Sequence, residues 1–281
     1  MLRIIPRLDI KGPNLVKGIH LEGLRVLGKP EEFAKYYYEN GADELLFMDV
    51  VASLYERNSL HDIVSKTAKA IFIPLTVGGG IRTIDDIKEV LRAGADKVAL
   101  NTAAIKNPNI IKEAAKKFGS STIVIAIEAI KQTYGNYLAY TDNGREHTGV
   151  EVVDWAIRVA ELGAGEIIIT SVDKEGTGEG FDIELTKKIS DSVSIPVIAH
   201  GGSGTKKQVE DIIKKSSVEA VAISSLFHYN YVLNQQNNLE QGKEGNIEFL
   251  KSGNSFKRIA EPININDLKK YLSNSGIDCR V

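Results

Sequence analysis

The sequence predicts an α/β fold, a closed (β/α)8 barrel, from three observations: eight short apolar runs, helical periodicity between them, and an internal repeat. The runs are rich in β-branched residues, which is typical of buried strands. They cover residues 4–10, 44–50, 71–77, 97–100, 122–128, 166–171, 195–200 and 220–224. Eight such strands are the number that closes a barrel of this type.

Helical periodicity marks several of the stretches between these runs. The clearest cover residues 30–40, 84–93, 108–118, 150–162 and 206–215. Strands that alternate with amphipathic helices form right-handed βαβ units around a parallel sheet. The alternation therefore favours a barrel with an outer layer of helices.

The internal repeat joins the two halves of the chain at an offset of about 122 residues. The matched segments are 44–49 with 166–171, 77–80 with 199–202, and 96–101 with 218–224. A constant offset of this kind indicates a duplicated four-strand half-barrel. It also aligns the end of the first strand, at Asp9, with the end of the fifth, at Glu128, within a few residues.

Length and composition fit a single barrel domain over residues 1–281, with 43% hydrophobic residues. The net charge of -2 provides no overall attraction to nucleic acid or to an anionic membrane. Cys279 is the only cysteine, which excludes an intrachain disulfide and favours a reducing compartment. With no signal peptide and no apolar run long enough to span a bilayer, we expect a soluble, cytoplasmic protein.

One segment interrupts the pattern after the eighth strand. Residues from about 230 to 262 are polar, rich in Asn, Gln and Gly, and have no sustained period. Loops that follow barrel strands lie on the catalytic face, so this insertion is expected near the entrance to the site. It is either a lid or partner contact, or a surface loop without a role.

Two glycine-rich turns predict phosphate sites, because glycine lets backbone amides approach an anion at a helix N-terminus. The turns span residues 78–80 and 201–204, and each is matched by two small polar residues after the next strand. The expected phosphate-binding residues are Gly79, Gly80, Asn101 and Thr102 in one half, and Gly201, Gly202, Ser224 and Ser225 in the other. The ligand is then a small molecule with a phosphate at each end; the alternative is that these are plain turn glycines.

Asp9 and Glu128 end the first and fifth strands, so they project into the barrel mouth from opposite walls. Paired carboxylates there suit general acid and general base catalysis, although either could be only a structural hydrogen-bond acceptor. Asp49, Asp173 and Lys17 also lie at or beyond strand ends and are candidate ligand contacts. A solvated loop position is the alternative for Lys17 and Asp173.

Four charged residues begin strands at the opposite end of the barrel: Arg3, Glu44, Lys97 and Glu166. Charges at strand starts are often surface ion pairs of little energetic value, and spacing alone favours that interpretation. Their alternating sign also fits a ring around the barrel bottom.

Together these motifs resemble the cyclase subunit of imidazole glycerol phosphate synthase, the HisF family. They are RIIP at 3–6, LD at 8–9, VKG at 16–18, DEL at 43–45, LTVGGGI at 75–81, GADKV at 94–98, GAGEI at 163–167, DKEGT at 173–177 and FH at 227–228. The resemblance covers nearly the whole chain apart from the insertion.

The resemblance implies a TIM barrel of the ribulose-phosphate-binding type, a lyase of histidine biosynthesis that needs no cofactor or metal. It would use ammonia from a glutaminase partner, docked as a heterodimer at the amino-terminal face of the barrel. The substrate would be a phosphoribulosyl-formimino-aminoimidazole carboxamide ribonucleotide, and the products imidazole glycerol phosphate and an aminoimidazole carboxamide ribonucleotide. Catalysis would fall to Asp9 and Glu128, and phosphate binding would include Gly176. The four strand-start charges would form an ammonia gate, which reverses the preference for surface pairs.

Three features depart from the family pattern. Glu128 replaces an aspartate, and its extra methylene moves the carboxylate by over ~1 Å, a displacement that can cost ~100-fold in rate. Arg7 shares the inward face of its strand with Arg3 and Asp9, which places a positive charge in the ammonia path. A pair between Arg7 and Glu128 would lower the pKa of the glutamate. In that case the double variant Arg7→Cys with Glu128→Asp would raise cyclase activity by more than the two single variants together. The insertion is the third departure.

Two other functions stay open at this point. A paralogue could pass ammonia to another acceptor and help amidinate a surface-polysaccharide sugar, as Arg7, Glu128 and the insertion favour. A non-catalytic barrel could only activate a glutaminase. The intact phosphate turns favour the cyclase, and the four-charge set with Lys17-Gly18 disfavours the related sugar-isomerising barrel.

Overall fold

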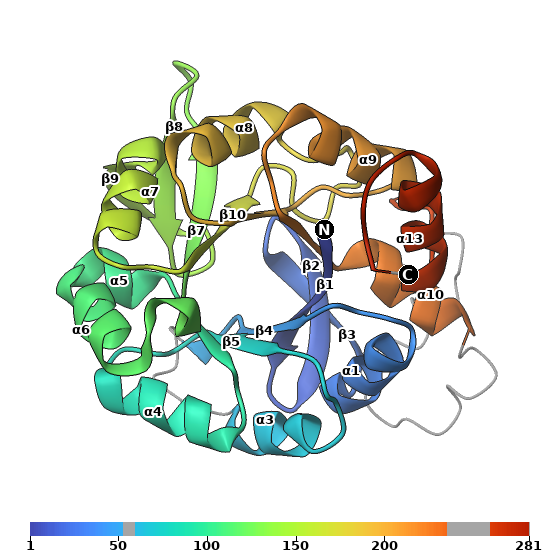
Figure 1. Ribbon diagram of the computed structural model, residues 1–281, viewed down its shortest axis with the longest axis horizontal. Coiled ribbons are helices and arrows are strands. Elements are labelled where there is room, and N and C mark those ends of the chain that lie inside the picture. Colours follow the sequence, from blue (N-terminus) through green and yellow to red (C-terminus); the bar gives the residue numbers. More distant parts are fainter. Residues whose placement is uncertain (53–59, 235–258, 281) are drawn as a thin grey trace.

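The computed structural model describes residues 1–52, 60–234 and 259–280. Within them, parallel strands close into a barrel surrounded by helices (Figure 1). In order around the barrel the strands are β1 (Arg3–Lys11), β4 (Leu45–Asp49), β5 (Leu75–Gly78), β6 (Lys97–Leu100), β7 (Ile123–Lys131), β10 (Glu166–Ser171), β11 (Val197–His200) and β12 (Ala220–Ile223). Pairing of β7 with β10 and of β12 with β1 completes the ring, which confirms the predicted barrel.

The helices lie outside the strands, as the alternating pattern predicts. They are α1 (Pro30–Glu39), α3 (His61–Ala68), α4 (Ile84–Ala93), α5 (Thr102–Lys106), α6 (Asn109–Phe118), α7 (Val152–Glu161), α8 (Ile183–Ser192), α9 (Lys206–Lys215), α10 (Ser225–Asn234) and α13 (Ile265–Asn274), with a 3-10 turn η1 (Ser120–Thr122). Capping boxes start α4 at Thr83 and α9 at Thr205, so the repeat extends to helix starts.

Two antiparallel hairpins extend the barrel strands and were not predicted. The first, β2 (Asn14–Ile19) with β3 (Glu22–Gly28), pairs with β1; the second, β8 (Tyr137–Thr141) with β9 (Glu146–Glu151), pairs with β7. Because β9 ends at Glu151, the helix predicted from residue 150 begins two residues later. The strand predicted over 71–77 likewise begins only at Leu75.

The interior of the barrel is layered along its axis. Ile5, Leu46, Val124, Ile168 and Ile198 belong to a buried apolar cluster distinct from the layer between strands and helices. Since side chains alternate across a strand, residues two positions further along β1, β10 and β11 project into the same interior. Those residues, Arg7, Thr170 and His200, are polar and buried. On β1, β10 and β11 the lumen thus changes from apolar to polar just below the mouth.

The predicted insertion lies mostly outside the described residues, at 235–258. Its first residues, 230–234, continue α10. None of the helices in the described ranges is long and apolar enough to cross a membrane.

Candidate active site

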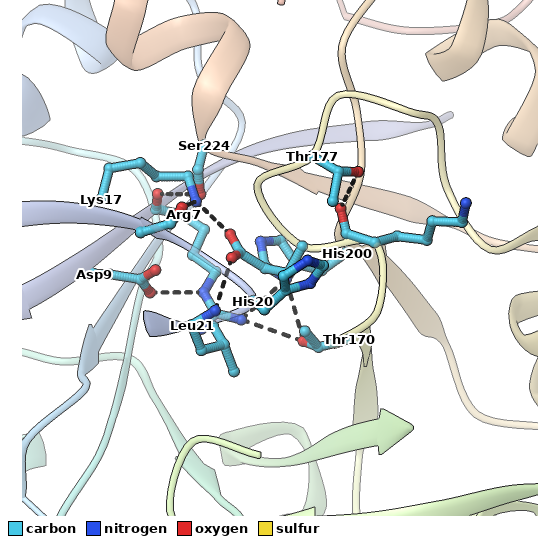
Figure 2. A network of polar contacts seen from close by, with 12 residues as sticks. Arg7, Asp9, Lys17, His20, Leu21, Thr170, Thr177, His200 and Ser224 are labelled. Atoms are coloured by element: carbon cyan, nitrogen blue, oxygen red, sulfur yellow. Dashed lines mark hydrogen bonds and ion pairs between the residues drawn. The ribbon is translucent and has the colours of Figure 1, made fainter. Parts of the chain in front are cut away.

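Asp9 is held by Arg7 at the top of the barrel interior (Figure 2). Arg7 Nε donates to Asp9 Oδ1 at 2.9 Å, and each residue is only 3% exposed. The same guanidinium donates to Thr170 Oγ1 at 3.2 Å and contacts His200 Nδ1 at 3.1 Å. Arg7 therefore reaches from β1 across the lumen to β10 and β11, and supplies the buried anion Asp9 with a counter-ion.

His200 is a neutral member of this network. Burial lowers the pKa of its imidazole well below the usual range, and the positive charge of Arg7 lowers it further. A neutral ring can use Nδ1 as the acceptor for the Arg7 guanidinium. The network accordingly holds one cation and one anion and is electrically balanced.

Glu128 has no such counter-ion. Its Oε2 accepts a hydrogen bond from the backbone amide of Gly144 at 2.9 Å. Burial raises the pKa of Glu128 to about 7, against the lowering effects of Arg7 and of the Gly144 amide. The hypothesis that Arg7 pairs with Glu128, so that the pKa of the glutamate falls below its usual value, is therefore wrong: Arg7 bonds to Asp9, two residues along its own strand, and the pKa of Glu128 is raised. Without that ion pair, there is no reason to expect a more than additive gain in cyclase activity from Arg7→Cys combined with Glu128→Asp.

A cavity of about 380 Å³ opens beside Glu128. Gly79, Gly80, Asn101 and Thr102 line it, so the first predicted phosphate turn faces this cavity. The buried Oδ1 of Asn101 has no hydrogen-bond partner, which leaves an acceptor available there. Other lining residues were not predicted: Arg82, Lys106, Asp142 and Asn143. The last two belong to the β8–β9 turn, which apolar periodicity did not reveal.

The second glycine turn is more enclosed. Gly201, Gly202 and Gly204 are buried. The Gly202 carbonyl accepts from Gly180 N at 2.7 Å, and the Gly204 carbonyl accepts from Glu261 N at 2.7 Å. A Cβ on Gly202 would overlap the carbonyl oxygen of Gly180, so this close backbone approach requires glycine. The loop after β10 thus packs directly on this turn.

The small polar residues predicted to pair with this turn are also buried. Ser224 donates its hydroxyl to the Arg7 carbonyl at 2.9 Å, which ties the end of β12 to β1. Ser225 begins α10. Gly176 lies in the enclosing loop and has a left-handed φ of 76°.

Lys17 is buried rather than solvated. Its ammonium forms a short ion pair with Glu175 and donates to the Gly18 carbonyl at 2.7 Å. Glu175 also accepts from Leu21 N at 3.2 Å. The pair therefore fastens the β2–β3 hairpin to the loop after β10. Glu175 is part of the DKEGT motif, but its pairing with Lys17 was not predicted because the two residues lie 158 positions apart in the sequence.

The other two predicted ligand contacts lie in different places. Asp49 lines the cavity and accepts from the amides of Val51 and Ala52 at 3.0 and 2.9 Å. Asp173 is exposed and accepts from the Lys131 amide at 2.8 Å. The structure brings Asp49, but not Asp173, to the cavity beside Glu128.

The four strand-start charges form a closed ring of ion pairs at the amino-terminal end of the barrel. Arg3 contacts Glu44 and Glu166, both at 2.7 Å. Lys97 contacts the same two carboxylates at 3.1 and 2.9 Å. Both glutamates are buried, so the arrangement is a ring and not a set of separate surface pairs. Across the described ranges, no group of His, Cys, Asp and Glu could hold a metal ion.

Comparisons with known proteins agree with this geometry. A family model described as "Histidine biosynthesis protein" matches residues 3–232. A relative from Legionella pneumophila, named imidazole glycerol phosphate synthase subunit HisF, is 61% identical over 203 residues, 72% of this chain and 96% of the relative. A protein of the same name from Alkaliphilus metalliredigens is 49% identical over 230 residues, 82% of this chain and 91% of the relative.

Proposed function

The chain belongs to the HisF family of imidazole glycerol phosphate synthase subunits, and on that premise we propose that it performs the cyclase reaction at Asp9 and Glu128. One observation carries the assignment of these residues. Two buried carboxylates end β1 and β7, on opposite sides of one mouth, and only Asp9 has a bonded counter-ion. Two titratable groups in contrasting environments are the pattern by which a site separates acid from base.

Glu128 is the proposed proton donor. With a pKa of about 7 it holds a proton over much of the neutral range and can deliver it to an oxygen of the substrate. Asp9, an anion fixed by Arg7, is the proposed acceptor of a proton from the attacking nitrogen. Ammonia attack and ring closure on the phosphoribulosyl nucleotide need one proton given and one taken, which these side chains supply.

The substrate carries two phosphates, and the two glycine turns are the proposed sites for them. Gly79, Gly80, Asn101 and Thr102 line the open cavity with two cations, Arg82 and Lys106. The proposed second site, on the other flank, consists of Gly201, Gly202, Ser224, Ser225 and Gly176, and the burial of its glycine turn supports a more enclosed position. Lys17, Asp49 and Asp173 stay candidate ligand contacts, and of the three only Asp49 lines the cavity beside Glu128.

A glutaminase is the proposed partner, and the ion-pair ring is the proposed entry for its ammonia. The ring closes the amino-terminal end of the lumen, opposite the carboxylates. Docking on that face would deliver ammonia without passage through solvent. A cytoplasmic location belongs to the same proposal.

The test is turnover by the purified full-length chain, with ammonium salt and the phosphoribulosyl nucleotide. The proposal predicts product without any partner protein, a rate ~100-fold or more lower in Glu128→Gln, and no change in Asp62→Asn. Asp62 is a matched control because its side chain is 91% exposed on α3. Absence of turnover in the folded protein would contradict the cyclase assignment, and would favour a paralogue with another acceptor or a barrel that only activates a glutaminase.

A further inference from the structure

A third carboxylate lies at the cavity beside Glu128. Asp142 occupies the turn between β8 and β9 and lines the same cavity as Glu128 and the first phosphate turn. Asp142 lies outside the motifs that the chain shares with the HisF family. The negative charge of Asp142 is unfavourable for phosphate binding, so phosphate binding does not explain why a carboxylate lines this cavity.

The turn is fastened across the mouth at several points. The Asn143 side-chain amide donates to the Val50 carbonyl in a short hydrogen bond. Asn101 Nδ2 donates to the Tyr140 carbonyl at 3.2 Å, and the Asp142 amide contacts Thr102 Oγ1 at 3.4 Å. These contacts tie the turn to the loops after β4 and β6. The turn is therefore a fixed part of the cavity wall.

The orientation of the Asp142 carboxylate is restrained as well. Its Oδ2 accepts from the Thr141 hydroxyl at 3.2 Å. Two residues further along, the Gly144 amide donates to Glu128 Oε2 at 2.9 Å. One short turn thus carries both the amide that donates to Glu128 and a carboxylate that lines the same cavity as Glu128.

Several charged groups act on Glu128 or line the same cavity. They are Arg7 and Asp9 on β1, Asp49 at the end of β4, Arg82 after β5, Lys106 on α5, and Asp142 in the turn. Arg7 and the Gly144 amide lower the pKa of Glu128, whereas burial, Asp142 and Asp9 raise it. Arg7 already neutralises Asp9 through a direct ion pair, whereas within the described part of the chain no cation forms an ion pair with Asp142.

We propose that Asp142 is a positioning residue for the cyclase: its carboxylate opposes ionisation of Glu128 and keeps that side chain in the hydrogen-donating form at neutral pH. The inference deepens the proposed function and rests on it for its catalytic meaning. The effect of Asp142 on the ionisation of Glu128 is a property of the protein without substrate, so it can be measured whether or not the protein turns over.

Asp142→Asn isolates the charge. Asp142 and Asn143 have left-handed φ angles of 53° and 61°, a region that asparagine tolerates as well as aspartate. The substitution thus preserves the turn while it removes one negative charge. Asp142→Gly is a second neutral variant for the same backbone conformation, and Asp142→Glu retains the charge.

The direct measurement is a pH titration of the Glu128 side-chain carboxyl by carbon-13 NMR in the full-length chain. We expect both neutral variants to move the midpoint down by about half a pH unit, as removal of a partly screened like charge requires. Asp142→Glu should restore most of the midpoint, and Asp62→Asn should not move it. An unchanged midpoint in folded Asp142→Asn and Asp142→Gly would overturn the proposal.

Turnover gives the second measurement. With free ammonia held constant, the neutral variants should lose about threefold in rate at pH 8 and almost nothing at pH 6. A uniform loss at both pH values would indicate a merely structural turn and contradict the proposal. If the wild type shows no turnover at all, the cyclase assignment fails, while the NMR midpoints still decide the role of Asp142.

Discussion

The two half-barrels share a scaffold but differ in how their mouth charges are paired. Each half extends its first strand with a hairpin whose turn has two left-handed residues, His20 and Leu21 in one, Asp142 and Asn143 in the other, at the repeat offset. Each turn also bonds to a strand-end carbonyl of the opposite half, Val172 or Val50. The backbone duplication therefore reaches into the catalytic face.

The charges on these matching frames diverge. On one side Arg7 neutralises Asp9 and Lys17 neutralises Glu175, in two buried ion pairs. On the other, the Gly144 amide is the one bonded partner of Glu128 among the residues that the structure describes, and Asp142 is a like charge nearby. Duplication supplied two equivalent positions for an acid, and the surrounding charges made them unequal.

Catalysis should show the largest effect, because each carboxylate has a role that the other cannot fill. We expect Asp9→Asn and Glu128→Gln each to reduce the ammonium-driven rate by ~100-fold to 10000-fold. The double variant should be little worse than either single variant, since both act in one proton-transfer system. Steady-state rates of the three proteins measure this; full additivity of the losses would show that the two sites act independently.

The second largest difference is expected in the free energy of unfolding of variants at the two carboxylates. Asp9→Asn leaves the Arg7 guanidinium buried without its anion, and we expect a loss of about 3 to 5 kcal/mol in the free energy of unfolding. Glu128→Gln leaves no buried cation without its anion and should not lower the free energy of unfolding at neutral pH. Urea unfolding of both variants measures the difference, and equal losses would contradict unequal pairing.

The pH dependence of stability sharpens the same contrast. Folded Glu128 keeps its proton up to about pH 7, whereas the unfolded chain releases it near 4.5, so unfolding free energy falls as pH rises between these values. At roughly 1.4 kcal/mol per pH unit the fall amounts to about 3 kcal/mol. Urea unfolding from pH 4.5 to 8 should show that Glu128→Gln lacks this fall. Parallel wild-type and variant curves would exclude ionisation of Glu128 as its cause.

The smallest effect is expected at the ring, far from both carboxylates. Lys97→Met removes two ion pairs but leaves Glu44 and Glu166 paired with Arg3, so it should lower stability by about 1 kcal/mol, with the ammonium-driven rate unchanged. Turnover and urea unfolding of this variant provide the check. A large loss of ammonium-driven rate would show that the ring acts on the mouth itself.

Much of this architecture was predictable from the sequence. Apolar runs located the barrel strands, and the repeat located both glycine turns. The hairpins were not predicted because β3 and β9 are mostly exposed or half-buried, so they lack the apolar pattern of a buried strand.

The partner of Arg7 was mispredicted for a different reason. Strand alternation correctly placed Arg7 on the inward face with Asp9, but it does not fix which way a long flexible side chain turns. A neighbour two residues along the same strand was available at 2.9 Å, and it prevailed over Glu128 across the mouth. Lys17 and Glu175 likewise lie 158 residues apart, beyond any periodicity argument.

The most direct test is the pH profile of turnover by the purified chain, with free ammonia held constant and the phosphoribulosyl nucleotide saturating. If protonated Glu128 is the acid, the rate falls as pH rises through about 7. A rate that instead increases through this range, or stays level while Glu128→Gln remains active, would contradict the division of roles between the two half-barrels.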